Sequence, residues 1–300
     1  YSRLGFFDGL LADFGEPCDD GWSDGSLCFM QSRSTVFDVS DVGHVVGRSR
    51  DCDGGPGNCR QRAFIWTEQQ GMVALPSPTD DTDWNCLASA VNDLDQVAGS
   101  CSRPDEFHGL VWMPAGTIVD LGECGPRQLN DLGQVVVGQE NSYRIWSAAA
   151  GWQELGTLGG DLALPWDINN QGQVVGQSTT ADGFRHAFLW PADDGMIDLG
   201  HLAEPVSDWS WSGAWAISDI GQVVGDSDTS SYDTRGFRWP ESTGMIELPP
   251  LEGHVYSDAF AVNNLGQVIG DSRPFANSSI ESHAVVWYVP LPSTTPEGAI

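Results

Sequence analysis

The sequence predicts an all-β fold built from six copies of one four-stranded unit, and three observations support this prediction. A motif resembling Ala-Ile-Asn-Asn-x-Gly-Gln-Val-Val-Gly recurs six times, and an apolar run that ends in Trp follows each copy. No segment of helical length shows a sustained helical period. Gly and Pro, 36 and 17 residues respectively, interrupt the chain throughout. The copies begin at Phe37, Ala90, Gln128, Asp167, Ala216 and Ala261, and the runs end at Trp66, Trp112, Trp146, Trp190, Trp239 and Trp287.

Each copy is interpreted as strand, tight turn, strand, loop, strand, turn and strand. In the copy that begins at Asp167, two β-rich segments flank the turn at residues 169–172. Asn169 can cap this turn with its own side chain, and Gly172 can adopt a positive φ. The third strand is the run at residues 186–190, and the fourth is the segment at residues 195–200. The polar residues between these two segments predict another turn.

Six such units predict a six-bladed β-propeller of four-stranded antiparallel blades. The last copy stops at residues 287–290 without a fourth strand, and residues 9–15 resemble that missing strand with one residue inserted. We therefore expect an N-terminal strand to complete the last blade and close the ring, which leaves no free sheet edge. The alternatives are an open solenoid and a partial seventh blade that contains residues 1–7.

A closed ring of repeats forms one structural unit, so we expect a single propeller domain over residues 1–290. Residues 291–300 are expected to form a Pro-rich C-terminal tail. No run approaches the roughly eighteen apolar residues that a membrane helix needs, so membrane insertion is not expected. The first residue is Tyr rather than Met, which indicates that a targeting segment has been removed.

The seven cysteines predict disulfides rather than a metal site. Cys86 and Cys101 lie symmetrically about the turn at residues 92–95, so they face each other across the first two strands of a hairpin. The further expected pairs, each bracketing a Gly-rich loop, are Cys52 with Cys59 and Cys18 with Cys28. Cys124 is left over, as a free thiol or as a link to another chain. Zinc needs a close chelating quartet, which is absent, and disulfides predict an exported protein at the cell surface or outside the cell.

The charge balance is strongly acidic, with 42 Asp and Glu, 13 Arg, no Lys and a net charge of −29. This charge repels phosphate backbones, so nucleic acid and anionic membranes are poor partners. Either the carboxylates form a hydrated surface, or some of them bind calcium as a cofactor. The candidate calcium ligands are Asp226, Asp228, Asp233, Asp51 and Asp53. None of these loops has the complete EF-hand spacing, which favours the hydrated surface.

The motifs resemble those of the HAF repeats, an extracellular family named after its His-Ala-Phe signature. The best copy combines residues 167–176, the run His186-Ala187-Phe188 and residues 196–200, and the resemblance extends over residues 37–287. It implies secretion and a propeller-like fold, and it brings no established catalytic residues. In the other copies the His position holds Arg62, His108, Ser142, Arg235 and His283. This variation indicates residues that pack blades or lie on the surface rather than metal ligands.

The long loops are predicted to share one face of the ring, where aromatic residues gather beside acidic clusters. The candidate ligand-binding residues are Trp22, Trp84, Trp209, Trp211 and Tyr232. Aromatic rings stack on the apolar faces of sugars, and carboxylates accept hydrogen bonds from sugar hydroxyls. The alternative is that these rings lie between blades and cover the core.

Two classes of function follow from this sequence. The first is a non-catalytic extracellular or cell-surface scaffold that binds glycan, matrix or copies of itself. It is favoured because the chain contains no GxSxG elbow, no HExxH motif and no phosphate-binding loop. The alternative is a polysaccharide-degrading enzyme, either a lyase or a glycoside hydrolase, that uses carboxylates on the long-loop face. The sequence does not single out a catalytic pair among its 42 acidic residues.

Overall fold

A computed structural model divides the described part of the chain into two compact units, one that ends at residue 153 and one that begins at residue 154. We call them the N-terminal and the C-terminal unit. The described residues are 34–52, 59–79, 83–139, 142–191, 195–202, 210–231, 233–240, 243–275 and 281–289. Among them, no helix is long and apolar enough to cross a membrane. The single domain over residues 1–290 stays a prediction, and the expected tail at 291–300 lies outside the described residues.

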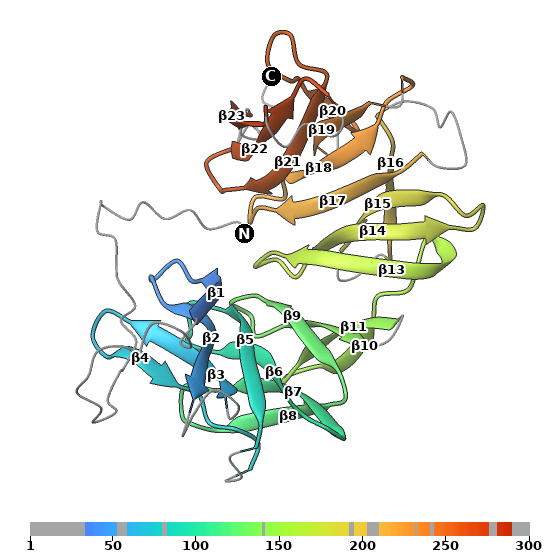
Figure 1. Ribbon diagram of the computed structural model, residues 1–300. Coiled ribbons are helices and arrows are strands. Elements are labelled where there is room, and N and C mark those ends of the chain that lie inside the picture. The colour runs from blue at the N-terminus through green and yellow to red at the C-terminus, as the bar shows by residue number, and fades with distance from the viewer. Residues whose placement is uncertain are drawn as a thin grey trace, which may run out of the picture. The chain divides into compact units, whose positions relative to one another are not determined.

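The described part of the N-terminal unit consists of three four-stranded antiparallel sheets (Figure 1). The first contains β1 (Ser34–Val39), β2 (Val45–Cys52), β3 (Cys59–Thr67) and β4 (Gly71–Ala74). The second contains β5 (Asn85–Val91), β6 (Val97–Arg103), β7 (Glu106–Trp112) and β8 (Ile118–Gly122). The third contains β9 (Gly125–Leu129), β10 (Val135–Gln139), β11 (Ser142–Ser147) and β12 (Gly151–Glu154). In each sheet the strands are adjacent in chain order.

The C-terminal unit continues the same pattern with three further sheets in its described residues. They contain β13 (Gly159–Ile168), β14 (Val174–Thr180), β15 (Arg185–Trp190) and β16 (Ile197–Gly200), then β17 (Ser212–Ile217), β18 (Val223–Asp228), β19 (Thr234–Trp239) and β20 (Ile246–Leu248). The last contains only β21 (Tyr256–Val262), β22 (Gln267–Arg273) and β23 (His283–Tyr288). The predicted all-β repeat is therefore confirmed. Residues 9–15 lie outside the described residues, so closure of a ring stays a prediction.

The predicted Asn-capped turn connects the first two strands of the sheets. In the fourth sheet, Asn169 Oδ1 accepts hydrogen bonds from the backbone N–H groups of Gln171 at 3.1 Å and Gln173 at 2.9 Å. Gly172 has a φ of +77°, as expected for the closing residue. In two other sheets a Ser hydroxyl accepts the second of these bonds: Ser40 accepts from the backbone N–H of His44, and Ser218 accepts from that of Gln222.

The same turn residues also link consecutive sheets, a role that the turn motif alone does not predict. Asn169 Nδ2 donates to the carbonyl oxygen of Ser218 in the next sheet at 3.1 Å. The following residue, Asn170, donates its backbone N–H to Asp219 Oδ1 at 2.9 Å, and Asp219 donates in the same way to Asn264 Oδ1 at 2.7 Å. One short motif therefore forms a turn and satisfies polar groups between sheets.

A one-residue β-bulge lies in the first strand of every described sheet, three residues before the turn motif. The bulged residues are Phe37, Ser89, Arg127, Trp166, Trp215 and Phe260. The bulge brings a backbone carbonyl close to the Gly that ends the Val-Val-Gly motif on the second strand. A Cβ added at Gly99 would lie 2.1 Å from Leu87 O, and one at Gly225 would lie 1.9 Å from Gly213 O. This contact explains the Gly in five of the six described sheets. In the third sheet Val137 occupies the equivalent position, and the Gly follows one residue later.

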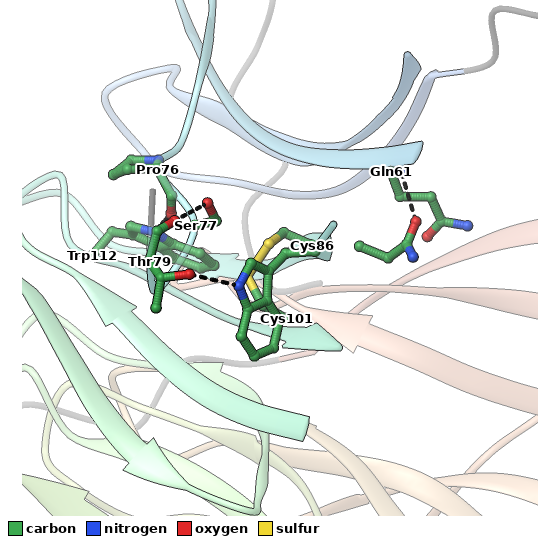
Figure 2. Close-up of a disulfide and its surroundings, with 9 residues drawn as sticks. Gln61, Pro76, Ser77, Thr79, Cys86, Cys101 and Trp112 are labelled. Atoms are coloured by element: carbon green, nitrogen blue, oxygen red, sulfur yellow. Dashed lines mark hydrogen bonds between the residues drawn. A yellow bond between two sulfur atoms is a disulfide. The ribbon is translucent and has the colours of Figure 1, made fainter. Parts of the chain in front are cut away.

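Apolar residues from adjacent sheets form the cores of both units. In the N-terminal unit, Val46 and Ala63 of the first sheet pack with Ala88 and Leu110 of the second. The Trp that ends the third strand covers the segment that connects two sheets. Trp112 Nε1 donates to Pro76 O at 2.7 Å, and both residues are labelled in Figure 2. Trp287 Nε1 makes the equivalent bond to Pro249 O at 2.9 Å. These bonds satisfy the indole N–H within a largely apolar layer.

The predicted disulfide between Cys86 and Cys101 is confirmed, and it joins directly opposite residues of β5 and β6 (Figure 2). The equivalent pairs in the C-terminal unit are serines: Ser212 with Ser227 and Ser257 with Ser272. Ser212 Oγ donates to Gly200 O at 2.6 Å and accepts from Ala187 N at 2.8 Å, so it links two sheets. Cys52 and Cys59 are opposite in the β2–β3 register. Their side chains, and Cys18 and Cys28 entirely, lie outside the described residues.

The Gly99→Ala substitution is expected to destabilise the protein by about 3 kcal/mol or more, because the added methyl group would overlap a backbone carbonyl. Gly125→Ala is the matched control, since the nearest atom to its added Cβ is Gly138 O at 3.7 Å. The control is expected to change the free energy of unfolding by less than about 0.5 kcal/mol. Urea unfolding of both variants measures the difference, and equal midpoints would contradict the bulge contact.

The double substitution Cys86→Ser and Cys101→Ser is expected to preserve the fold, because serine pairs occupy the same positions in two other sheets. It removes a cross-link between residues 15 positions apart, which should cost about 3 kcal/mol of unfolding free energy in the chain-entropy account. Circular dichroism and urea unfolding test both parts. An unfolded double variant would show that the serine and cysteine pairs are not interchangeable.

Candidate functional site

Exposed aromatic side chains occupy the bulge positions of the C-terminal unit. Trp166 on β13 is 36 % exposed, Phe260 on β21 is 49 % exposed, and Trp215 on β17 is half-buried. Trp211, directly before β17, adds another half-buried ring. We call these four residues the aromatic row. Large apolar side chains exposed together are a common feature of binding surfaces.

The rings of the aromatic row contact one another at defined angles. The centroids of Trp166 and Trp215 are 5.5 Å apart with an interplanar angle of 62°, and those of Trp211 and Trp215 are 6.2 Å apart at 55°. Such inclined contacts are favourable between aromatic rings and restrict their movement. A β-bulge redirects the side chain of the extra residue. Because the bulge recurs at one position, it places an aromatic residue equivalently in three consecutive sheets.

The N-terminal unit carries different side chains at its bulge positions. They are Phe37, Ser89 and Arg127. The guanidinium of Arg48 lies 5.6 Å from the centroid of the Phe37 ring, and that of Arg127 lies 5.2 Å from the Tyr143 ring. These are distances at which a cation and an aromatic face attract each other. Among the described residues, bulge positions with an aromatic residue in three consecutive sheets therefore occur only in the C-terminal unit.

A buried carboxyl group lies under the aromatic row. Asp226 is 5 % exposed, and its Oδ2 accepts a hydrogen bond from Trp215 Nε1 at 2.6 Å. Its Oδ1 accepts a second bond from the backbone N–H of Ala259 at 2.7 Å. Burial raises the pKa of Asp226 to about 7, although these two hydrogen bonds act in the opposite direction. Of the nearby charges, Asp271 raises this pKa and Arg273 lowers it.

The aromatic residues predicted from the sequence have different positions. Trp211 lies in the aromatic row, whereas Trp84 is only 1 % exposed and packs in the core. Trp84 Nε1 donates to Thr79 Oγ1 at 3.1 Å, and the guanidinium of Arg103 lies 4.5 Å from the centroid of its ring. The Trp84 ring is therefore not available to a ligand, and it has the core-covering role considered as the alternative. Trp22, Trp209 and Tyr232 lie outside the described residues.

The proposed calcium loop at residues 226–233 is not assembled as expected. Asp226 is engaged by Trp215 and Ala259, Asp228 Oδ1 accepts from Thr234 Oγ1 at 3.3 Å, and an Asp233 carboxylate oxygen lies 3.8 Å from Arg235 Nη2. The three carboxylates therefore have separate partners in the protein, and Asp233 lies outside β18, directly before β19. The described residues contain no group of three or more His, Cys, Asp or Glu that could hold a metal ion. Asp53 and the side chain of Asp51 lie outside the described residues.

The variable His position of the repeat forms cross-strand pairs. Nδ1 of His108 lies 2.8 Å from Asp120 Oδ2, and Nδ1 of His186 lies 2.8 Å from Asp198 Oδ1. In the fifth sheet, Arg235 Nε donates to Glu247 Oε1 at 3.1 Å. A basic residue on the third strand therefore pairs with an acidic residue on the fourth. This arrangement supports the packing role expected from the sequence.

Cys124 is a free, buried cysteine, which agrees with the first of the two expected alternatives and argues against a link to another chain. Its side chain is 2 % exposed, and its Sγ lies 3.4 Å from Leu121 O. It precedes the turn motif by six residues, as do Ser212 and Ser257, which also bond to the preceding sheet. Burial raises the pKa of the Cys124 thiol to about 11, so the reactive thiolate is scarce at neutral pH.

A pocket of about 310 Å³ lies in the N-terminal unit, on the segment that connects its first two sheets. Its lining residues are Arg62, Ala74, Leu75, Pro76, Ser77 and Thr79. Pro76 and Thr79 also accept the indole hydrogen bonds of Trp112 and Trp84, and Figure 2 shows them beside the disulfide. The pocket has no acidic residue in its lining, so it contains no carboxylate pair for acid–base chemistry.

No protein-family model and no curated protein matches this chain. Solved structures are similar in fold. The β-propeller domain of the Trilobed protease from Pyrococcus furiosus is 9% identical, with a TM-score of 0.56 over 86% of this chain and 81% of that domain. Dipeptidyl peptidase 4 from Porphyromonas gingivalis is 10% identical, with a TM-score of 0.53 over 80% of this chain and 42% of the peptidase. A prolyl endopeptidase is 12% identical, with a TM-score of 0.56 over 89% of this chain and 43% of the endopeptidase.

These similarities support a β-propeller fold for the chain and nothing about its activity. The chain spans less than half the length of the two peptidases it matches. Identities of 9% to 12% show the fold alone, because propellers with unrelated functions share this architecture.

The Cys124→Ser substitution is expected to leave the elution of the protein unchanged in non-reducing gel filtration, because the buried thiol cannot reach another chain. The serine would occupy a position where Ser212 and Ser257 already bond to the neighbouring sheet. A wild-type dimer that disappears in this variant and in reducing buffer would contradict the buried position. Ser257→Cys is the matched control, because it places a thiol at the equivalent buried position of another sheet, and its elution should also be unchanged.

Proposed function

We propose that the chain is a non-catalytic β-propeller scaffold that binds carbohydrate at the aromatic row. The observation that carries this proposal is the recurrence of one bulge in three sheets, with an exposed or half-buried aromatic residue at each. A core-forming role alone does not require Trp166 and Phe260 to be exposed. Glycan in the extracellular matrix is the expected partner, and self-association is the wider alternative.

The physical basis is stacking between aromatic rings and the C–H faces of sugars. Exposed Trp and Phe rings lose little conformational entropy on binding, since few side-chain torsions need to be fixed. The inclined contacts of Trp215 with Trp166 and Trp211 already restrict these rings before a ligand arrives. The net charge of −29 disfavours polyanionic ligands and suits neutral sugars.

The proposed location is the cell surface or the extracellular space. A disulfide such as Cys86–Cys101 persists mainly in oxidising compartments, and the resemblance to HAF repeats is consistent with export. We also propose that six blades form a ring closed by residues 9–15. The three described strands of the last sheet support this, because each other sheet has four.

A polysaccharide-degrading enzyme is the second candidate, and Asp226 is the observation that favours it. A carboxyl group with a pKa of about 7 has the acidity that a general acid needs near neutral pH. Both oxygens of Asp226 already accept hydrogen bonds from the protein, and the side chain is buried. These contacts favour a positioning role, and the binding scaffold is therefore the better-supported function.

Trp166→Ala and Phe260→Ala are each expected to weaken carbohydrate binding about tenfold, which corresponds to about 1.4 kcal/mol, because each removes a stacking surface. A glycan array with the wild-type protein identifies the ligand, and calorimetry measures the variants. Trp152→Ala is the matched control, since Trp152 is 40 % exposed but lies in the N-terminal unit.

A wild-type protein that binds nothing on a broad glycan array would refute the carbohydrate proposal. Binding that survives both row substitutions, but not the control, would move the site to the N-terminal unit. Release of shortened products from a bound polysaccharide would favour the enzyme instead.

A further inference from the structure

We propose that Asp226 is a positioning residue for Trp215 and that its ionisation regulates the aromatic row. This inference rests on the proposed binding of carbohydrate at that row. The two atoms involved are the indole Nε1 of Trp215 and Oδ2 of Asp226, which are 2.6 Å apart. One hydrogen bond therefore connects a buried ionisable group to a ring in the centre of the row.

The backbone around Trp215 is shaped to make this bond. Gly213 is directly opposite Asp226 in the β17–β18 register, and Trp215 is the bulged residue that follows. A Cβ added at Gly213 would lie 3.0 Å from Cη2 and 3.1 Å from Cζ2 of the Trp215 indole. The missing side chain thus leaves space for the indole on this face of the sheet. The ring fits between its own strand and the carboxylate that holds its Nε1.

The second oxygen of Asp226 extends the connection to the next sheet. Oδ1 accepts from the backbone N–H of Ala259 on β21 at 2.7 Å. Ala259 directly precedes Phe260, the bulged aromatic residue of that strand. Asp226 is therefore bonded to Trp215 and to the residue adjacent to Phe260. A change in its hydrogen bonding acts on the row in two sheets.

The charged groups around Asp226 come mainly from β22. Asp271 and Arg273 act on it, with opposite signs. Arg273 also forms an ion pair with Asp258 of β21, and its Nε lies 3.5 Å from Asp271 Oδ1. Two other strands pack against β18. The strand β17 carries no ionisable side chain, and β19 carries Arg235 and Arg238. Arg235 is paired with Glu247. On its own strand, Asp228 bonds to Thr234.

Ionisation changes how Asp226 can hold its two donors. As a carboxylate it accepts strong charge-assisted bonds at both oxygens. Once protonated, one oxygen becomes a hydroxyl, which is a weaker acceptor and must itself find an acceptor. Burial raises the pKa of this carboxyl to about 7, so the change takes place near neutral pH. Trp215 is then held firmly above this pH and less firmly below it.

The fourth sheet provides an internal comparison at the same position. Gln177 follows the Val-Val-Gly motif of β14 as Asp226 follows that of β18. Its Nε2 donates to Ser212 O in the next sheet at 2.9 Å. This neutral amide links sheets without titrating. The pH response is therefore expected to be specific to the sheet that carries Asp226.

The test follows the indole N–H resonance of Trp215, assigned by its loss in Trp215→Phe, in the ligand-free protein from about pH 5 to about pH 9. We expect it to shift with a midpoint of about 7 in the wild type and to be constant in Asp226→Asn. Asp228→Asn, on the same strand, is the matched control and should keep the shift. A wild-type resonance that stays constant with pH would overturn the proposal. A pH-dependent shift that persists in Asp226→Asn would also overturn it, because the titrating group would then be a histidine.

A measurement on the wild-type carboxyl carbon of Asp226 covers the case in which Asp226→Asn does not fold. This resonance should titrate with the same midpoint as the indole, and Trp215→Phe should raise that midpoint, because the hydrogen bond favours the carboxylate. A midpoint at the ordinary value for Asp would overturn the proposal.

Carbohydrate binding separates this inference from the function on which it rests. The wild type should bind severalfold more weakly at about pH 5.5 than at about pH 8, whereas Asp226→Asn should bind equally at both. An intact Trp215 titration in a protein that binds no carbohydrate would support the link between Asp226 and Trp215 and refute the proposed function. Binding without any Trp215 titration would refute the inference alone.

Discussion

The β-bulge in the first strand of each sheet is the constraint on which the other features depend. In five of the six described sheets it brings a carbonyl so close to the second strand that a Cβ would overlap it, as at Gly99 and Gly225, whereas the third sheet has Val137 at this position. It also redirects one side chain per sheet, and in the C-terminal unit these are Trp166, Trp215 and Phe260. The Gly of the Val-Val-Gly motif and the variable side chain at the bulge are thus both consequences of the same bulge.

Features that depend on neighbours in the chain were predictable from the sequence. The Asn-capped turn at Asn169 requires only local chemistry, and the bond between Cys86 and Cys101 requires only the register of one hairpin. The bulge was not predicted, because one extra residue in a strand does not alter the spacing of the turn motif. Only Trp211 of the aromatic row was therefore selected in advance. The aromatic residues three positions before the turn, Trp166 and Phe260 among them, were the available signal.

Contacts between sheets were also beyond prediction, because they depend on how consecutive repeats pack. Trp84 is of a residue type that is common in ligand-binding sites, yet its indole N–H donates to Thr79 in the core. Asp226 lies in an acidic loop motif, yet its strand position turns it toward Ala259 of the next sheet. In both cases tertiary packing determined a role that the sequence pattern left open.

The equivalence between the Cys86–Cys101 disulfide and the Ser257–Ser272 pair has a consequence for how repeat proteins diversify. The same two opposite positions hold a covalent cross-link within one sheet and, in another sheet, two hydroxyl groups that hydrogen-bond to other segments. Since each form occupies the same two opposite residues, a lineage can exchange them without altering the backbone. Mechanical reinforcement can therefore be added to single modules independently, according to the redox conditions that the protein encounters.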